Sequence, residues 1–195
     1  ASREGTVVLF DDLMEEATSR AREIVKQKNP ELSEAVKDAI AEAVALGALK
    51  YSMLSRDNTK VVTFDWDAAL DFNGQAAPYI QYAHVRAGSI LRKAGVTLPK
   101  VVAFPNGLVK AEVDLIEVLT RLPQDVVKAA EDYRPLTIAN LAFDLAKAFN
   151  DFYNTCQVLN VEPEVRDYRL RLVAASKQVI ATSLDLLGIN SPSVM

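Results

Sequence analysis

Two tyrosines and an arginine recur at helical spacing within residues 76–92, AAPYIQYAHVRAGSILR, and together they could bind nucleic-acid bases. Pro78 suits the first turn of a helix. Tyr79, Tyr82 and Arg86 follow at i, i+3 and i+7, which places them on one stripe next to an apolar stripe that can be buried. Flat rings beside a guanidinium group are what unstacked bases bind. The alternative is that the tyrosines only pack against the core, which is the commoner use of this spacing.

The charge of the chain is acidic overall and basic around this stretch. A net charge of −4 and a pI near 5.1 argue against a surface that wraps nucleic acid indiscriminately through its phosphates. Residues 1–75 carry nine basic and fourteen acidic side chains, whereas residues 76–195 carry thirteen and twelve. Every charged residue between positions 76 and 111 is basic: Arg86, Arg92, Lys93, Lys100 and Lys110. A solvated lysine-rich face is the alternative explanation of this pattern.

Residue types for other chemistries are present without a matching arrangement. His84 lies inside the same predicted helix with no partnered nucleophile in the sequence, so we interpret it as a ring that hydrogen-bonds at the edge of the core. One histidine and one cysteine, Cys156, cannot form a four-ligand zinc site, and a single thiol fits a reducing compartment. Acidic pairs at helix starts are explained by the helix dipole, and the sequence has no glycine-rich phosphate loop. We therefore expect neither a metal nor a cofactor site in this chain.

Hydrophobic periodicity predicts a mainly α-helical chain. A short extended run at residues 6–10 precedes the helices, and residues 51–65 break the helical period. The predicted helices cover residues 11–28, 33–47, 66–72, 78–95, 111–121, 123–133, 136–157 and 163–187. Gly188 is placed to end the last of them.

These elements predict a multi-helix bundle with a short irregular or extended N-terminal connector. The last helix is apolar around much of its circumference, so we expect it in the middle of the bundle. Half of the residues are apolar, which is enough for a sizeable core in one domain or in one domain plus a remnant of another. No apolar run approaches the roughly twenty residues that span a bilayer, and the first residues lack a signal-peptide pattern, so we expect a cytoplasmic protein.

Several spaced stretches resemble, in the right order, the motifs of one family, the arginyl-tRNA synthetases, which are class I aminoacyl-tRNA ligases. The resemblance covers nearly the whole chain. The stretches are SREGTVV at residues 2–8, FDDL and EEA within residues 10–17, KYSMLS at residues 50–55, FDW at residues 64–66, APYIQYAHVR at residues 77–86, AFNDFY at residues 148–153, RLRLVAA at residues 169–175 and LDLLGI at residues 184–189.

The resemblance implies two parts of the chain with different functions. Residues 1–60 are similar to the tail of the catalytic domain with connecting helices, and residues 61–195 are similar to the helical DALR-type anticodon-binding domain. Ser2, Arg3 and Gly5 match the rear of the signature loop that helps to bind ATP. The family activates its amino acid in a domain that contains an HIGH sequence, which does not occur in this chain. The resemblance therefore implies a C-terminal piece, inactive by itself, of an enzyme that uses ATP with magnesium.

The resemblance also implies a partner, the anticodon loop of an arginine-accepting tRNA. Bases splayed from that loop would pack on Tyr79 and Tyr82, with Arg86 at their edges or at the backbone. In the family the second signature helix and the last residues also approach the anticodon, which maps onto Tyr153 and onto Met195 with its neighbour Val194. We expect a monomer without DNA or membrane partners.

Two other functions compete with this interpretation. A helical interaction module would use the same tyrosine stripe to meet another protein and would bind no RNA. A small hydrolase would need chemistry at His84, and its replacement would abolish activity.

Overall fold

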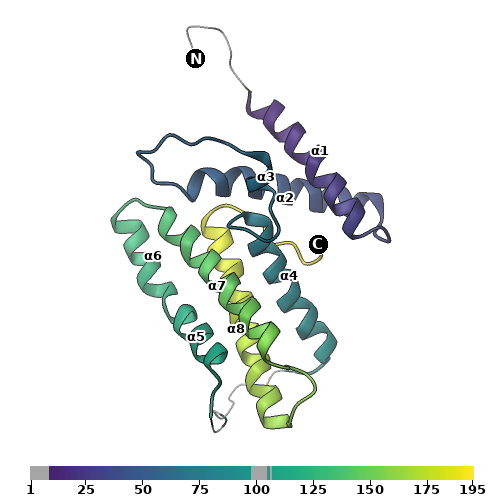
Figure 1. The fold of residues 1–195 in the computed structure, drawn as a ribbon, viewed down its shortest axis with the longest axis vertical. Helices are drawn as coiled ribbons and strands as arrows, with labels where there is room; N and C mark the ends of the chain where they lie inside the picture. Colours follow the sequence, from purple (N-terminus) through teal and green to yellow (C-terminus); the bar gives the residue numbers. More distant parts are fainter. Residues whose placement is uncertain (1–8, 98–104, 106) are drawn as a thin grey trace.

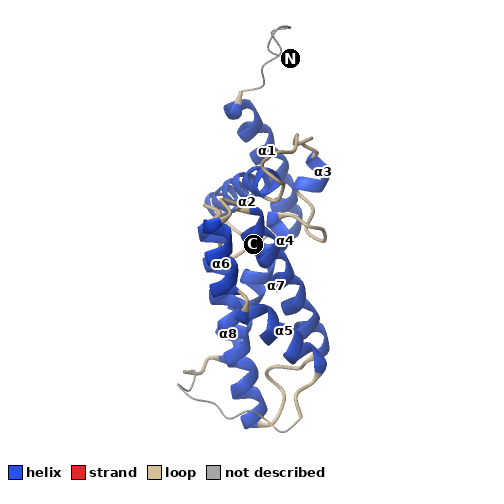
Figure 2. Cartoon of the chain, turned by 90° about the vertical axis from the view of Figure 1, so that its left-hand side faces the viewer, coloured by secondary structure: helices blue, strands red, loops and turns tan. Residues whose placement is uncertain are grey.

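The computed structural model describes residues 9–97, 105 and 107–195, which form α-helices joined by irregular segments, with no strand among them (Figure 2). The prediction of an extended run at residues 6–10 falls mainly outside the described residues. Phe10 itself begins the first helix. The helices are α1 (Phe10–Lys28), α2 (Glu34–Leu54), α3 (Trp66–Ala69), α4 (Ala77–Ala94), α5 (Lys110–Thr120), α6 (Leu122–Glu131), α7 (Leu136–Thr155) and α8 (Pro163–Leu186).

The first two helices form a pair that crosses one end of a bundle made by α4 to α8 (Figure 1). Small buried residues of α1, such as Ala17 and Ala21, let its backbone approach the apolar face of α2. Ile40, Val44 and Leu49 fill that face, and α3 adds Ala69. This cluster, which we call the α1–α3 core, is the smaller of two hydrophobic cores.

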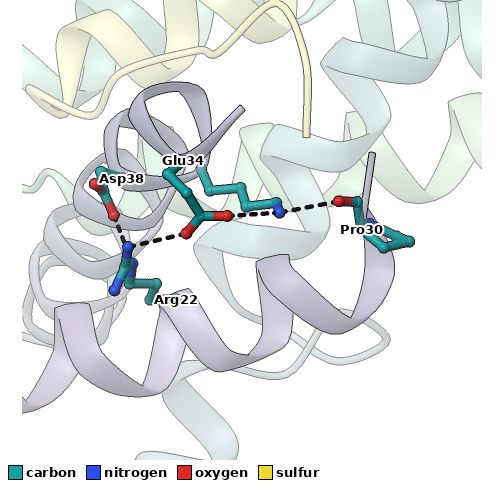
Figure 3. A network of polar contacts seen from close by, with 5 residues as sticks. Arg22, Pro30, Glu34 and Asp38 are labelled. Carbon is teal, nitrogen blue, oxygen red and sulfur yellow. Dashed lines mark hydrogen bonds and ion pairs between the residues drawn. The ribbon is translucent and has the colours of Figure 1, made fainter. Parts of the chain in front are cut away.

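A polar network fixes the corner between α1 and α2 (Figure 3). Arg22 Nε lies 2.5 Å from Asp38 Oδ1, and its Nη2 lies 3.1 Å from Glu34 Oε2. The other oxygen of Glu34 accepts a hydrogen bond of 2.9 Å from Lys37 Nζ, which also donates to Pro30 O at 3.0 Å. Lys37 is only 5% exposed, so its buried ammonium group needs both acceptors. The network holds the α1–α2 turn, residues 29–33, in place.

The second core lies among α4, α5, α7 and α8. Its largest fully buried side chains come mostly from the last two long helices: Leu141, Leu145, Phe149, Phe152, Leu170, Ile180 and Leu184. α8 packs against α4, α5 and α7, as expected for a helix that is apolar around much of its circumference. Tyr51 joins α2 to this core, because its hydroxyl donates a 3.1 Å hydrogen bond to Ala139 O of α7.

The prediction that α2 halts around Gly47 is wrong, because the helix continues to Leu54. Gly47 faces α4 and the end of the chain. A Cβ at this position would lie 3.0 Å from Gln81 Nε2 and 3.2 Å from Ile189 Cγ2. The glycine therefore permits a close approach between segments and does not end the helix. The other predicted helices of at least ten residues correspond to observed ones with ends shifted by one or two residues.

Among the described residues, no helix is both long enough and apolar enough to cross a membrane.

Candidate nucleic-acid interface

Helix α4 supplies the centre of the candidate site. Pro78 occupies its first turn, and Gly95 ends it in a left-handed conformation with φ of 58°. The face with Ile80, Ala83 and Ala87 is fully buried in the second core. Burial of that face fixes the rotation of the helix and leaves the neighbouring stripe at the surface.

Arg86 stands between two tyrosine rings from different helices. Its guanidinium carbon lies 4.8 Å from the ring centroid of Tyr82 on α4 and 4.6 Å from that of Tyr153 on α7. Its Nη1 donates a 2.7 Å hydrogen bond to Oδ1 of Asn150, one turn before Tyr153. We call Tyr82, Arg86 and Tyr153 the Arg86 stack. Cation–π contacts and a hydrogen bond to a nearly buried amide hold the guanidinium plane in one position.

Tyr79 takes a different place from the Arg86 stack. Its half-buried ring packs against the second core, and its centroid lies 5.6 Å from that of Phe143 on α7. Tyr82 and Tyr153, by contrast, are 38% and 42% exposed. On α4, Tyr79 thus packs against the core, whereas Tyr82 lies at the surface.

A pocket of about 440 Å³ opens beside Tyr82 and Arg86, within the size range of small-molecule sites. Its walls come from the end of α1, the α1–α2 turn, the loop between α3 and α4, helix α4 and the last residue. The lining residues are Val25, Lys28, Asn29, Phe72, Asn73, Tyr82, Arg86 and Met195. This set holds two cations, two amides, two aromatic rings and no carboxylate side chain. A base edge finds donors and acceptors there, and a phosphate finds positive charge.

The structure brings together four of the five predicted RNA-binding residues. Tyr82, Arg86 and Met195 line the pocket, and Tyr153 contacts Arg86. Tyr79 lies on the same helix within the packing just described. The predicted ATP-loop residues, Ser2, Arg3 and Gly5, lie outside the described residues.

Sequence reasoning missed the pocket residues that precede α4. Lys28 Nζ lies 5.3 Å from the ring centroid of Phe72, so these two side chains form one wall from separate elements. Asn73 lies directly after the predicted helix at residues 66–72, and its sequence context indicates no role for it. Asn150 lies within the family-like stretch at residues 148–153, which by itself indicates no role for the amide. A polar amide on a buried helix face was the signal that could have identified it.

The predicted alternative chemistry at His84 has no structural support. The ring is nearly buried and its Nδ1 lies 3.0 Å from Pro192 O. The pKa of His84 is lowered, chiefly by burial of the ring. The hydrogen bond to Pro192 raises this pKa in part, and the charge of Lys177 lowers it further. Burial also raises the pKa of the Cys156 thiol. Among the described residues, no group of three or more His, Cys, Asp or Glu side chains could hold a metal ion.

Comparison with known proteins defines the class of this domain. The model of the DALR anticodon binding domain matches residues 80–195, which include the Arg86 stack and Met195. The model of the class I (R) tRNA synthetase catalytic domain matches residues 1–66. The chain belongs to the DALR anticodon-binding domain family and carries part of a class I synthetase catalytic domain before it. This confirms the resemblance found in the sequence.

The relatives point to one kind of enzyme. The arginine–tRNA ligase of Thermococcus sibiricus is 42% identical over 100% of this chain, which spans 32% of that relative. The arginine–tRNA ligase of Haloarcula marismortui is 41% identical, again over the whole chain and 34% of the relative. Among solved structures, the arginyl-tRNA synthetase of Thermus thermophilus superposes with a TM-score of 0.88 at 39% identity, covering 97% of this chain and 32% of that one. The chain thus spans about a third of the length of these relatives.

Proposed function

We propose that this chain is the anticodon-recognising part of an arginine–tRNA ligase. The observation that carries the proposal is the Arg86 stack, which lies within the matched DALR domain and at the rim of a pocket lined by no acidic side chain. One unstacked base of the anticodon loop enters the pocket and stacks on an exposed tyrosine ring. Stacking contributes about 1–3 kcal/mol per base and accepts any base, so the choice among bases comes from hydrogen bonds and pocket shape.

Each group of the site has a distinct part in this recognition. Arg86 presents its remaining N–H groups to acceptors on the base edge. Asn29 and Asn73 offer amide donors and acceptors, and Lys28 balances the negative charge of the RNA backbone. Tyr79 does not line the pocket and supports the site by stabilising α4 through its packing against Phe143.

The parent enzyme attaches arginine to its tRNA with ATP and magnesium ions. Residues 1–60 belong to its catalytic domain with connecting helices, and residues 61–195 form the anticodon-binding domain. Ser2, Arg3 and Gly5 contribute to the ATP site of the complete enzyme. The chain alone is inactive, and the enzyme is a cytoplasmic monomer with no DNA or membrane partner.

The direct test is binding of the 195-residue chain to two tRNA transcripts that differ only in the anticodon. We expect the transcript with an arginine anticodon to bind at least about tenfold more tightly, since each base contact contributes on the order of 1–3 kcal/mol. Arg86→Lys should reduce this preference, because an ammonium group cannot reproduce a planar, stacked guanidinium. Equal affinity of the folded chain for both transcripts would overturn the proposal. A stable complex with a protein helix across Tyr82, unaffected by tRNA, would favour the interaction module instead.

A further inference from the structure

The last residues of the chain, residues 188–195, which we call the tail, lie along α4 (Figure 1). Backbone carbonyls of the tail accept hydrogen bonds from side chains of the bundle. Lys50 on α2 donates to Gly188 O. Three residues of α4 donate further along the tail: Gln81 to Asn190 O at 2.8 Å, His84 to Pro192 O at 3.0 Å and Arg92 to Ser193 O at 3.4 Å.

Gln81 is the most constrained of these donors. Its side chain is 0% exposed, and its Nε2 also donates to Ala43 O of α2 at 3.1 Å. One amide group therefore joins α2, α4 and the tail. Gly47 leaves the space that this side chain needs, because a Cβ there would contact Nε2 at 3.0 Å. Both donor hydrogens of this buried amide are used on backbone carbonyls, whereas its Oε1 has no hydrogen-bond partner among the described residues.

His84 repeats the arrangement one turn later. A carbonyl oxygen only accepts, so Nδ1 of His84 carries the proton that bonds to Pro192 O. Positions 81 and 84 are three residues apart, so both side chains project from the same face of α4. Residues 82 and 86 of the same helix project toward the pocket that Met195 lines. Helix α4 thus supplies two lining residues of the pocket directly and holds the segment that supplies a third, Met195.

We propose that Gln81 and His84 are positioning residues for RNA recognition, because they fix the tail so that Met195 closes the pocket against the bound base. The inference rests on the proposed function. It adds that affinity for the anticodon loop depends on two buried donors that contact no RNA. Met195, half-buried against the α1–α3 core, is the group through which they act.

The test is a double-mutant cycle in the 195-residue chain, with an RNA stem–loop that carries an arginine anticodon as the probe. His84→Leu removes the donor, whereas His84→Asn keeps an amide N–H near the position of Nδ1. We expect His84→Leu to weaken binding about five- to tenfold, as for the loss of one buried hydrogen bond, and His84→Asn to restore affinity to within about twofold. In a Met195→Gly background, where the tail delivers no side chain, His84→Leu should add less than about a twofold loss.

Matched controls separate positioning from general stability. Arg92→Ala removes the long, exposed contact to the tail and should change affinity by less than about twofold. If the Gln81→Leu chain folds, we expect it to lose affinity for the stem–loop to the same extent as His84→Leu. Should His84→Leu fail to fold, His84→Phe keeps the ring shape without the donor and carries the same expectations.

Two results would overturn the inference while leaving the proposed function intact. One is wild-type affinity of the folded variant that lacks the His84 donor, while Tyr82→Ala weakens binding. The other is an equal loss from the His84 substitution with and without the Met195 side chain. If the wild-type chain does not distinguish the arginine anticodon at all, the proposed function itself fails.

Discussion

Tyr82 and Tyr79 show how two like residues on one helix acquire different surroundings. The Tyr82 ring is exposed and contacts Arg86, whereas the Tyr79 ring packs against Phe143 in the second core. The contrast lets binding and stability be measured separately at the residue scale.

We therefore expect one alanine substitution to affect mainly binding and the other to affect mainly the free energy of unfolding. Tyr82→Ala should weaken binding to an arginine anticodon stem–loop about fivefold or more, since it removes a stacking surface, and should leave melting nearly unchanged. Tyr79→Ala should lower the free energy of unfolding by about 1–3 kcal/mol, because a half-buried aromatic ring is lost. Binding titrations and urea denaturation of both variants measure the two effects. A Tyr82→Ala chain that is strongly destabilised would show that this ring, too, serves mainly in packing.

His84 gives the stability of the chain a dependence on pH. Burial keeps its pKa in the folded state below the unfolded value of about 6.5, so the unfolded chain binds the proton more readily. Stability from neutral His84 is complete above pH 6.5 and falls as the pH drops toward the folded pKa. The nearby charge of Lys177 opposes protonation in the folded state as well.

Lowering the pH from 7.5 to 5.5 should therefore reduce the free energy of unfolding by up to about 1.4 kcal/mol through this residue. His84→Asn should remove that part of the decrease. Urea denaturation of both chains at the two pH values measures the difference. Asp57, whose pKa is lowered to about 2 chiefly by its hydrogen bonds to Thr59, stays ionised across this range and does not contribute. If the free energy of unfolding of the His84→Asn chain decreased by the same amount, the pH dependence would come from residues other than His84.

At the scale of elements, α2 and α4 approach each other closely because of one glycine. A glycine-to-alanine change inside a helix usually stabilises by up to about 1 kcal/mol. At Gly47 the added Cβ would meet Gln81, Ile189 and Ala77, at 3.0, 3.2 and 3.4 Å respectively. These side chains are buried and cannot move away freely.

Gly47→Ala should consequently destabilise the chain by about 1–3 kcal/mol, the usual effect of overpacking a core. Gly88→Ala is the matched control on α4. Its Cβ would meet only the ends of flexible side chains, Arg92 Nη1 at 3.2 Å and Lys177 Cε at 3.5 Å. We expect this variant to be as stable as wild type or slightly more stable. Denaturation midpoints compare the pair, and a stabilising Gly47→Ala would contradict the close approach.

On the scale of the whole molecule, an acidic chain has a local basic surface at the pocket. The net charge of −4 gives no general attraction to phosphates. Lys28 and Arg86 are nevertheless the charged side chains that line the pocket. Binding should therefore depend on a few ion pairs together with stacking.

This predicts a weak salt dependence for the anticodon stem–loop. With one phosphate contact from Lys28 and at most about one more, the slope of log affinity against log salt concentration should be roughly −1 to −2. Affinity measured from 50 to 200 mM salt gives this slope. A slope steeper than about −5 would show many phosphate contacts and would argue against recognition centred on this pocket.

The sequence by itself determined the features that depend on local spacing. Helical periodicity located the long helices, and the i, i+3, i+7 pattern placed Tyr79, Tyr82 and Arg86 on one stripe of one helix. Motif order along the chain established the family, which the domain matches confirm. These properties follow from neighbouring residues and need no knowledge of distant contacts.

Only the tertiary structure decided how distant segments meet. It placed Asn150 and Tyr153 of α7 around Arg86, brought Lys28 and Phe72 to one wall, and laid the tail along α4. It also made Gly47 a contact point within a continuing helix. The physical reason is that loop paths and the depth of helix packing set these contacts, and residues far apart in sequence carry no spacing rule that predicts them. The pocket beside Arg86 exists because five separate segments converge there.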